Sequence, residues 1–418
     1  MATLKKNIFY SGILTTANYI FPLITYPYVS RVLGVANIGA CNFVDSIINY
    51  FLILSALGIG TVGIREIAKN KGNKPDLQKT FSQLFTINTI STTIALAVLL
   101  IAMHTVPKLQ ENYDLMWIGV LKLVFNYLLI EWFFKGLEDF KYVTNRTIFV
   151  RCLYVLSVFV FVRTTNDVSI YYFLTSATIV VNAIINLVYA RRFIKFKLCF
   201  SSLKEQTKSV CTLGVYNILT SLYTTFNVAY LGFVSSETQV GYYTTSTKIH
   251  TIILMAFTAV TGVMMPRMAS ILSEKKYSEY GRLIKKSVAF LLIFSTPCIL
   301  LIEIFAPQIV NLIAGNGYQG AVIPLRIIAP LILVIGFEQI LITQSLMPMG
   351  KDTAVLINSI LGAIVGLAAN VILVPNLAAI GSAIAWTISE LVVMLSALFF
   401  FLREWNKIKM NVSHINYH

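Results

Sequence analysis

Long apolar runs alternate with short polar segments along almost the whole chain. Each run has about the length that a helix needs to cross the hydrocarbon core of a bilayer, ~20 residues. The polar segments between them are too short to form domains of their own. The pattern predicts twelve membrane-spanning helices, near residues 9–30, 42–64, 80–103, 115–135, 147–163, 168–190, 210–233, 247–271, 286–306, 323–347, 354–374 and 377–402.

The composition of the 418 residues supports this interpretation. Hydrophobic residues make up 57% of the chain and charged residues 12%, and the mean hydropathy is +0.75. A soluble domain carries about 45–50% apolar and about 25% charged residues, so this chain cannot cover a soluble surface. The composition excludes a soluble enzyme, a disordered scaffold, a disulfide framework and a fibrous repeat. It leaves an all-α polytopic membrane protein.

The formal net charge of +15 would suggest a nucleic-acid partner in a soluble protein. Here most Lys and Arg residues fall in alternate loops between the apolar runs, and such an asymmetry marks the cytoplasmic side of a membrane protein. Clusters at 65–79, 191–208 and 267–286 are examples. The sequence therefore predicts that both termini are cytoplasmic and that the chain has no nucleic-acid partner.

The longest basic loop, from Arg191 to Lys208, lies near the middle of the chain. It divides the predicted helices into an N-terminal lobe, residues 1–208 with helices 1–6, and a C-terminal lobe, residues 209–418 with helices 7–12. One constant shift along the sequence pairs Lys6 with Lys208 and Arg65 with Arg267. Because both halves start on the cytoplasmic side, they would be parallel repeats, an arrangement common in alternating-access transporters.

Three segments carry a family resemblance: Tyr26–Gly34, Ala56–Ala68 and Glu131–Phe140. They resemble Wzx-type oligosaccharide (O-antigen) flippases of the multidrug/oligosaccharidyl-lipid/polysaccharide exporter superfamily. Many members carry Tyr where Val62 stands here.

That resemblance implies two six-helix lobes around a central cavity in the bacterial cytoplasmic (inner) membrane. The implied cargo is an oligosaccharide on an undecaprenyl-diphosphate carrier, moved from the inner to the outer leaflet. A polysaccharide polymerase and a chain-length regulator of lipopolysaccharide or other surface-polymer synthesis are the partners that it suggests, besides membrane lipids.

Polar residues recur at helical spacing in the first and seventh predicted helices. Asn18 lies on one face with Ser11 and Thr15, and Asn217 shares a face with Ser221. Polar faces are costly against lipid, so they face water or protein. Asn18 and Asn217 are therefore candidates for a hydrated, substrate-binding wall, and helix–helix packing is the alternative.

Ionisable residues inside the runs are the sharper signal, since each costs roughly 2.5–3.5 kcal/mol at mid-membrane on insertion scales. Arg31, Lys122 and Lys248 are candidate ligands for the diphosphate, because cations bind phosphate oxygens well. Asp45 would balance one of them or take part in ion coupling. The alternative is that these long side chains only extend to the headgroups.

Three carboxyl groups in the second half, Glu303, Glu338 and Glu390, are candidates for ion coupling. A buried carboxyl group can exchange a proton, but it can equally serve as a partner for nearby hydroxyl groups and cations. Glu131, beside the aromatic run Trp132–Phe134, is predicted to anchor its helix at the membrane interface.

No catalytic group, metal ligand set or cofactor motif is predicted. Gly58–Gly63 fits GxGxxG but closes an apolar run, whereas a dinucleotide site needs a strand before it and a helix after it. No GxxxxGK[ST] segment is present, and the five Cys and four His residues lack metal-binding spacings. The sequence predicts a transporter and not an enzyme.

Three rival functions remain open. A cation-coupled multidrug exporter and a lipid II flippase would share the fold, although a drug exporter should prefer an anionic cavity. A membrane-embedded glycosyltransferase or polymerase would need a catalytic loop larger than any connection predicted here, the longest being about 20 residues.

Overall fold

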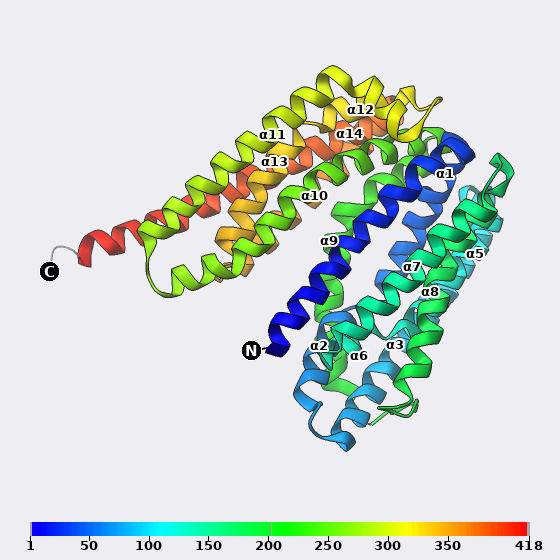
Figure 1. Cartoon of the computed structure of the whole chain (residues 1–418), viewed down its shortest axis with the longest axis horizontal. Helices are drawn as coiled ribbons and strands as arrows, with labels where there is room; N and C mark the ends of the chain where they lie inside the picture. The colour runs from blue at the N-terminus through cyan, green and yellow to red at the C-terminus, as the bar shows by residue number, and fades with distance from the viewer. Residues whose placement is uncertain (1, 202, 416–418) are drawn as a thin grey trace. The chain divides into compact units, whose positions relative to one another are not determined.

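The computed structural model describes residues 2–201 and 203–415, and within these residues it is helical with no strand (Figure 1). It divides into two compact units, Met1–Thr225 and Phe226–His418. The division between them falls within one helix, α9 (Leu203–Val234). The sequence-based division after residue 208 stays a prediction.

Unit 1 contains eight helices, two short 3-10 segments and the first part of α9. They are α1 (Ala2–Ala56), α2 (Ile59–Asn70), α3 (Lys74–Thr105), α4 (Pro107–Gln110), α5 (Tyr113–Asn126), η1 (Tyr127–Leu129), α6 (Glu131–Gly136), α7 (Phe140–Phe161), η2 (Thr165–Asp167) and α8 (Val168–Ala190).

Helix α1 is two helices joined at Gly34, where φ is 78° and ψ is 169°. Glycine adopts such a conformation without steric cost. The first part runs along α7, since the Tyr28 hydroxyl donates to the Val162 carbonyl at 2.7 Å. The second part runs back in the opposite direction, as Figure 1 shows. The first two predicted spans are therefore both present, joined by a tight turn.

Unit 2 contains the rest of α9 and the remaining elements of the chain. They are α10 (Glu237–Ser273), α11 (Tyr277–Ala314), η3 (Gln319–Ala321), α12 (Val322–Ile328), α13 (Leu331–Glu338), the π-helical η4 (Gln339–Leu346) and α14 (Asp352–Ile415).

Helix α14 is also a hairpin, broken at Ala378 with φ 47° and ψ −123°. Its two arms pack side by side, because the Ser396 hydroxyl donates to Asn358 Oδ1 at 2.7 Å and Ser389 donates to the Gly362 carbonyl at 2.8 Å. The last two predicted spans are thus the two arms of α14.

Eight helical stretches in the described part of the chain are long and apolar enough to cross a membrane, and a bent pair makes a ninth. The bent pair, residues 319–346, turns by 41° between α12 and α13 and ends in η4. Because two of the eight stretches contain α1 and α14, which are each two helices, this count is compatible with the twelve predicted spans.

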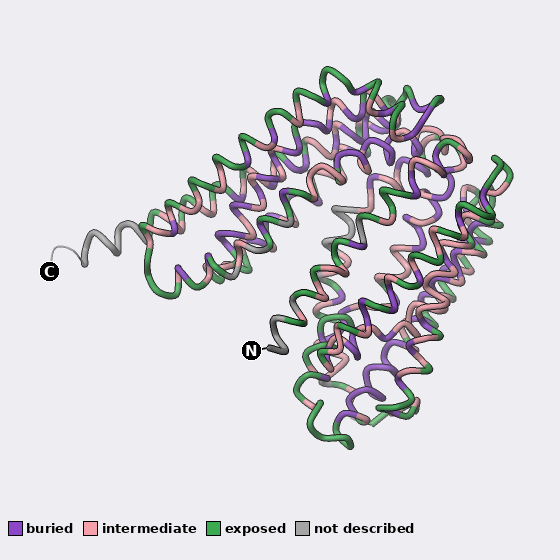
Figure 2. Tube along the Cα trace, viewed as in Figure 1, coloured by how far each residue is buried: buried purple, intermediate pink, exposed green. Residues whose placement is uncertain are grey.

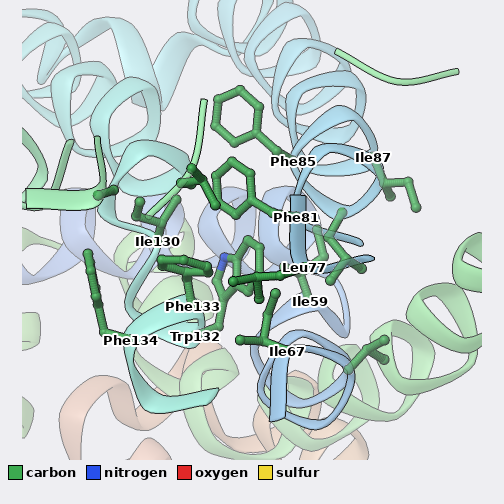
Figure 3. Packing of buried hydrophobic residues seen from close by; sticks show 14 of the residues in the cluster. Ile59, Ile67, Leu77, Phe81, Phe85, Ile87, Ile130, Trp132, Phe133 and Phe134 are labelled. Atoms are coloured by element: carbon green, nitrogen blue, oxygen red, sulfur yellow. The ribbon is translucent and has the colours of Figure 1, made fainter. Parts of the chain in front are cut away.

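Large apolar side chains cover the outer faces of both units, as expected of a protein surrounded by lipid. Phe149, Ile293 and Leu312 are 65%, 73% and 74% exposed. Buried residues follow the inner faces of the helices (Figure 2). In unit 1 the aromatic residues Phe81, Trp132 and Phe133 form the centre of one such core, shown in Figure 3.

Candidate functional site

A partly buried ion pair connects three helices of unit 1. The ammonium group of Lys122 on α5 donates to Asp45 Oδ1 on α1, and the hydroxyl of Tyr172 on α8 donates to the same oxygen at 3.2 Å. The ammonium group also lies 4.2 Å from the centre of the Tyr172 ring, a cation–π contact. Lys122 and Asp45, two of the candidates, are therefore brought together, while the roles predicted for them stay predictions.

Close packing of α5 against α1 positions this pair. Gly119 lies one turn before Lys122, and a Cβ atom there would come within 2.6 Å of Ile48 on α1. The absent side chain lets the two helices approach. Ile48 is one turn from Asp45, so the same close approach brings the carboxylate to the ammonium group.

The two members of the pair differ in exposure. The Lys122 side chain is 8% exposed and that of Asp45 is 42% exposed. The ammonium group is thus enclosed by protein, whereas part of its counter-ion is open to the surroundings. An anion arriving at this place would meet Asp45 first and would have to compete with it for Lys122.

Tyr172 was missed by the sequence analysis. An aromatic residue within an apolar run is ordinary, and its spacing gives no sign that it faces a charged group. Only the packing of α8 against α5 places its ring beside Lys122.

The other candidates in unit 1 take different positions. Arg31 is exposed on α1, and its Nη1 donates to the Pro27 carbonyl of the same helix at 2.7 Å. The Asn217 amide on α9 donates to the Leu57 carbonyl, at the break between α1 and α2, at 2.8 Å. The side chain of Asn18 lies outside the described residues, as does that of Ser221.

Glu131, which the sequence analysis predicts to anchor its helix at the membrane interface, forms two ion pairs. It accepts from Arg146 on α7 at 2.5 Å and from Lys135 at 3.1 Å. The Arg146 side chain is 2% exposed, so this pair fixes α6 to α7 inside unit 1.

A carboxyl pair lies inside unit 2. Glu338, the last residue of α13, is 7% exposed, and Glu390 on α14 is 5% exposed. The two carboxyl groups interact directly. Two of the three carboxyl candidates are thus brought together, and two adjacent buried carboxylates would repel each other strongly.

Other polar residues of unit 2 surround this pair. The Trp386 indole donates to Glu390 Oε1 at 2.7 Å, and the ring of His250 on α10 packs edge-on against Trp386 with centroids 5.3 Å apart. His250 is fully buried, and neither ring nitrogen has a hydrogen-bond partner among the described residues. The sequence analysis considered His250 only as a metal ligand and missed it here.

The remaining candidates of unit 2 are Lys248 and Glu303. Lys248 is half-buried on α10. Glu303 is exposed on α11, on a surface that it shares with the exposed side chains of Leu300 and Ile304. Their roles in binding and coupling stay predictions.

No group of three or more His, Cys, Asp or Glu side chains that could hold a metal ion is found among residues 2–201 and 203–415. Among the candidates, the structure thus brings together an enclosed cation with a partly exposed counter-ion in unit 1 and a buried carboxyl pair in unit 2. Binding and ion coupling at these two places stay predictions.

Comparison with known families and proteins gives consistent matches. A family model described as "Polysaccharide biosynthesis protein" matches residues 4–272. A protein of Escherichia coli strain K12 that is named as an O-antigen transporter is 28% identical over 341 residues, which are 81% of this chain and 82% of that protein.

Solved structures match over nearly the full length. A lipid II flippase, MurJ, in an inward closed conformation has a TM-score of 0.76 at 12% identity, covering 97% of this chain and 90% of its own. An inward-facing multidrug resistance transporter of the MATE family has a TM-score of 0.74 at 15% identity, covering 93% and 95%. At these identities the similarity establishes a common fold.

Proposed function

Because the chain belongs to the polysaccharide biosynthesis protein family, we propose that it is a flippase for a lipid-linked oligosaccharide. Its cargo is a repeat unit of O-antigen or another surface polysaccharide on an undecaprenyl-diphosphate carrier. The protein moves this cargo from the inner to the outer leaflet of the bacterial cytoplasmic membrane by alternating access. The chain is a transporter and not an enzyme, with both termini cytoplasmic.

The family match carries this proposal, since it extends through unit 1 and into unit 2. The name of the Escherichia coli relative and the common fold with a lipid II flippase support it. The fold alone does not choose among cargoes, because a multidrug transporter shares it as closely.

Lys122 is the residue of unit 1 that we assign to the diphosphate. It is an enclosed ammonium group whose present partner, Asp45, is partly exposed and therefore exchangeable. A phosphate oxygen can replace a carboxylate oxygen as acceptor for the same donor. Arg31, Lys248, Asn18 and Asn217 remain candidates for further contacts with the cargo.

The carboxyl pair Glu338–Glu390 is the part of unit 2 that we assign to ion coupling. Losing its proton would leave two adjacent carboxylates, which repel each other strongly in a dry interior. Proton release therefore favours a rearrangement of α13 relative to α14. The π-helical η4 begins directly after Glu338, and π-helical turns are frequent at functional sites.

The membrane potential offers a second driving force. An interior-negative potential favours outward movement of anions by about 2.3 kcal/mol per charge per 100 mV. A diphosphate with two charges would gain ~4–5 kcal/mol at 100 mV.

The decisive experiment is deletion of the gene followed by analysis of polyprenyl-linked intermediates. We expect a completed repeat unit to accumulate on the cytoplasmic side, and complementation with the intact chain to remove it. Normal export in the deletion strain would contradict the proposal. Drug sensitivity in the same strain would favour the multidrug exporter, and arrest of peptidoglycan synthesis would favour the lipid II flippase.

A further inference from the structure

A groove lined by basic side chains lies at the turn between α10 and α11, wholly inside unit 2 (Figure 1). Its volume is about 670 Å³, and it is open to the surroundings. One carboxylate, Glu279, and five cationic side chains line it: Arg267, Lys275, Lys276, Arg282 and Lys286. Five positive charges against one negative charge give the lining a strong attraction for anions.

Most of these cations have no carboxylate partner in the protein. Two of the five do: Arg267 pairs with Glu279 at 3.2 Å, and Lys276 pairs with Glu274 at 2.6 Å. Among the residues that the structure describes, no ion pair is found for the other three, Lys275, Arg282 and Lys286. Their counter-charge must therefore come from outside the chain.

The arrangement of these charges costs the free protein stability. Arg282 and Lys286 lie one turn apart on α11, and like charges at this spacing destabilise a helix. Lys275, in the turn, has a φ of 57°, a left-handed conformation that suits glycine better than lysine. Membrane topology sets how many Lys and Arg residues a loop carries, but it does not require them to surround a groove. A bound anion would offset their repulsion.

The basic face of α11 continues directly into an apolar one. Phe290 follows Lys286 by one turn and Ile293 by two, and these two side chains are 43% and 73% exposed. The spacing puts them on the same side of the helix as Arg282 and Lys286. Large exposed apolar side chains of a membrane protein face lipid. The groove therefore ends where contact with acyl chains begins, which fits an amphipathic molecule with an anionic head.

Aromatic residues place the groove at the depth of the headgroups. Tyr280, between Glu279 and Arg282 on α11, packs against Trp405 of α14 with ring centroids 5.3 Å apart. Trp405 in turn stacks on Phe401, with centroids 6.1 Å apart. Tyr and Trp collect at the membrane–water interface, and the charge asymmetry makes this end of unit 2 cytoplasmic.

We propose that the groove binds the headgroup of an anionic phospholipid of the cytoplasmic leaflet. Arg282 and Lys286 donate to its phosphate oxygens, and one acyl chain lies along Phe290 and Ile293. Charge-assisted bonds to phosphate are strong, and basic pockets on the cytoplasmic side of membrane proteins bind such lipids. A soluble anion would make no use of the adjoining apolar face. The lipid is a ligand of unit 2 whatever cargo the chain transports.

Two neighbouring lysines provide a matched pair of variants, Lys286→Gln and Lys285→Gln. Both lysines are exposed on α11, and neither forms an ion pair within the described part of the chain, but only Lys286 lines the groove. Each substitution removes one positive charge close to Arg282. Without lipid, both variants should therefore melt in detergent no lower than the unmodified chain.

Native mass spectrometry of the purified full chain measures lipid binding. The probes are dioleoylphosphatidylglycerol, which is anionic, and dioleoylphosphatidylcholine, which is zwitterionic. We expect the anionic lipid to bind about tenfold more tightly, and Lys286→Gln to weaken its binding by about fivefold. Lys285→Gln should bind it as the unmodified chain does. Equal binding of the two lipids, or equal losses in the two variants, would mean a diffuse attraction by positive charge and would overturn the proposal.

Competition identifies the source of the phosphate group. Glycerol phosphate, the headgroup without acyl chains, should not displace phosphatidylglycerol at equal concentration, and neither should undecaprenyl diphosphate. Displacement by glycerol phosphate would make the groove a site for soluble anions, and displacement by undecaprenyl diphosphate would make it a site for the cargo carrier. Either result contradicts an assignment to phospholipid.

Discussion

Losing the ion-pair partner should cost the protein more stability at Lys122 than at Asp45. The lysine side chain is enclosed, whereas the carboxylate is 42% exposed. An unpaired charge destabilises the folded protein more when the protein shields it more completely from water. The pair is therefore asymmetric, and the asymmetry can be measured.

We expect Asp45→Ala to lower the melting temperature of the detergent-solubilised protein more than Lys122→Ala does. The first variant strands an enclosed ammonium group, at a cost of about 3 kcal/mol, while the second leaves a carboxylate that water can reach. The double variant should recover part of the loss of Asp45→Ala. Equal effects of the two single variants would show that the environments of the two groups do not differ.

The carboxyl pair Glu338–Glu390 leads to a second prediction about single residues. Glu338→Gln keeps the size and can donate a hydrogen bond to Glu390 but cannot lose a proton. We expect it to reach normal membrane abundance and to lose flipping driven by an imposed pH gradient in proteoliposomes. Glu303→Gln is the comparison variant, because Glu303 is an exposed carboxyl group on α11. If only Glu303→Gln abolished the pH-driven component, the coupling site would be Glu303 and not the pair.

Among elements, α2 and α6 are held together by glycine contacts on both sides. Gly63 on α2 faces the Trp132 ring, and Gly136 on α6 faces Ile67, where a Cβ atom would come within 2.7 Å. The motif Glu131–Phe140 and the Gly58–Gly63 segment, both conspicuous in the sequence, are thus two sides of one interface.

Gly63→Ala should destabilise the protein by about 1–3 kcal/mol, because the added methyl group overpacks this interface. Gly60→Ala, three residues away on the same helix, meets open space and should be neutral or slightly stabilising, since Ala favours helix. Thermal unfolding in detergent compares the two. Equal melting temperatures would contradict the packing described here.

Asn217 also connects helices, at the break between α1 and α2. Its amide bonds the Leu57 carbonyl, and the Gly58 N–H donates to the Val210 carbonyl at 3.1 Å, so α9 is fixed to the break between α1 and α2. Asn217→Leu leaves the Leu57 carbonyl without this partner and should cost about 1–3 kcal/mol. Asn217→Ser keeps a donor and is the comparison. If Asn217→Leu melts at the same temperature as Asn217→Ser, water replaces the amide as the partner of the Leu57 carbonyl.

For the whole molecule, the basic loops predict an orientation. Thr164, between α7 and η2, should face the periplasm, and Ser278, at the start of α11, should face the cytoplasm. In a chain with its five cysteines replaced, a membrane-impermeant maleimide should label Thr164→Cys in intact spheroplasts. Ser278→Cys should react only after permeabilisation. The reverse pattern would invert the topology and the direction of the proposed transport.

The sequence by itself determined the fold class and the family, and both are confirmed: the described part of the chain is helical, and the family match agrees with the resemblance. The apolar stretches of the structure are compatible with the twelve predicted spans. Apolar length and charge are properties of single segments, so they can be recognised without neighbours. Charge inside an apolar run also identified Asp45, Lys122, Glu338 and Glu390 as residues that lipid would exclude.

Tertiary structure alone decided which of these residues meet. A helical repeat fixes the face on which a side chain lies, but the neighbour of that face depends on how helices rotate and cross. Tyr172 beside Lys122, His250 beside Trp386 and the open space at Gly60 arise only from that packing. Each results from contacts between segments far apart in the chain, which no local pattern records.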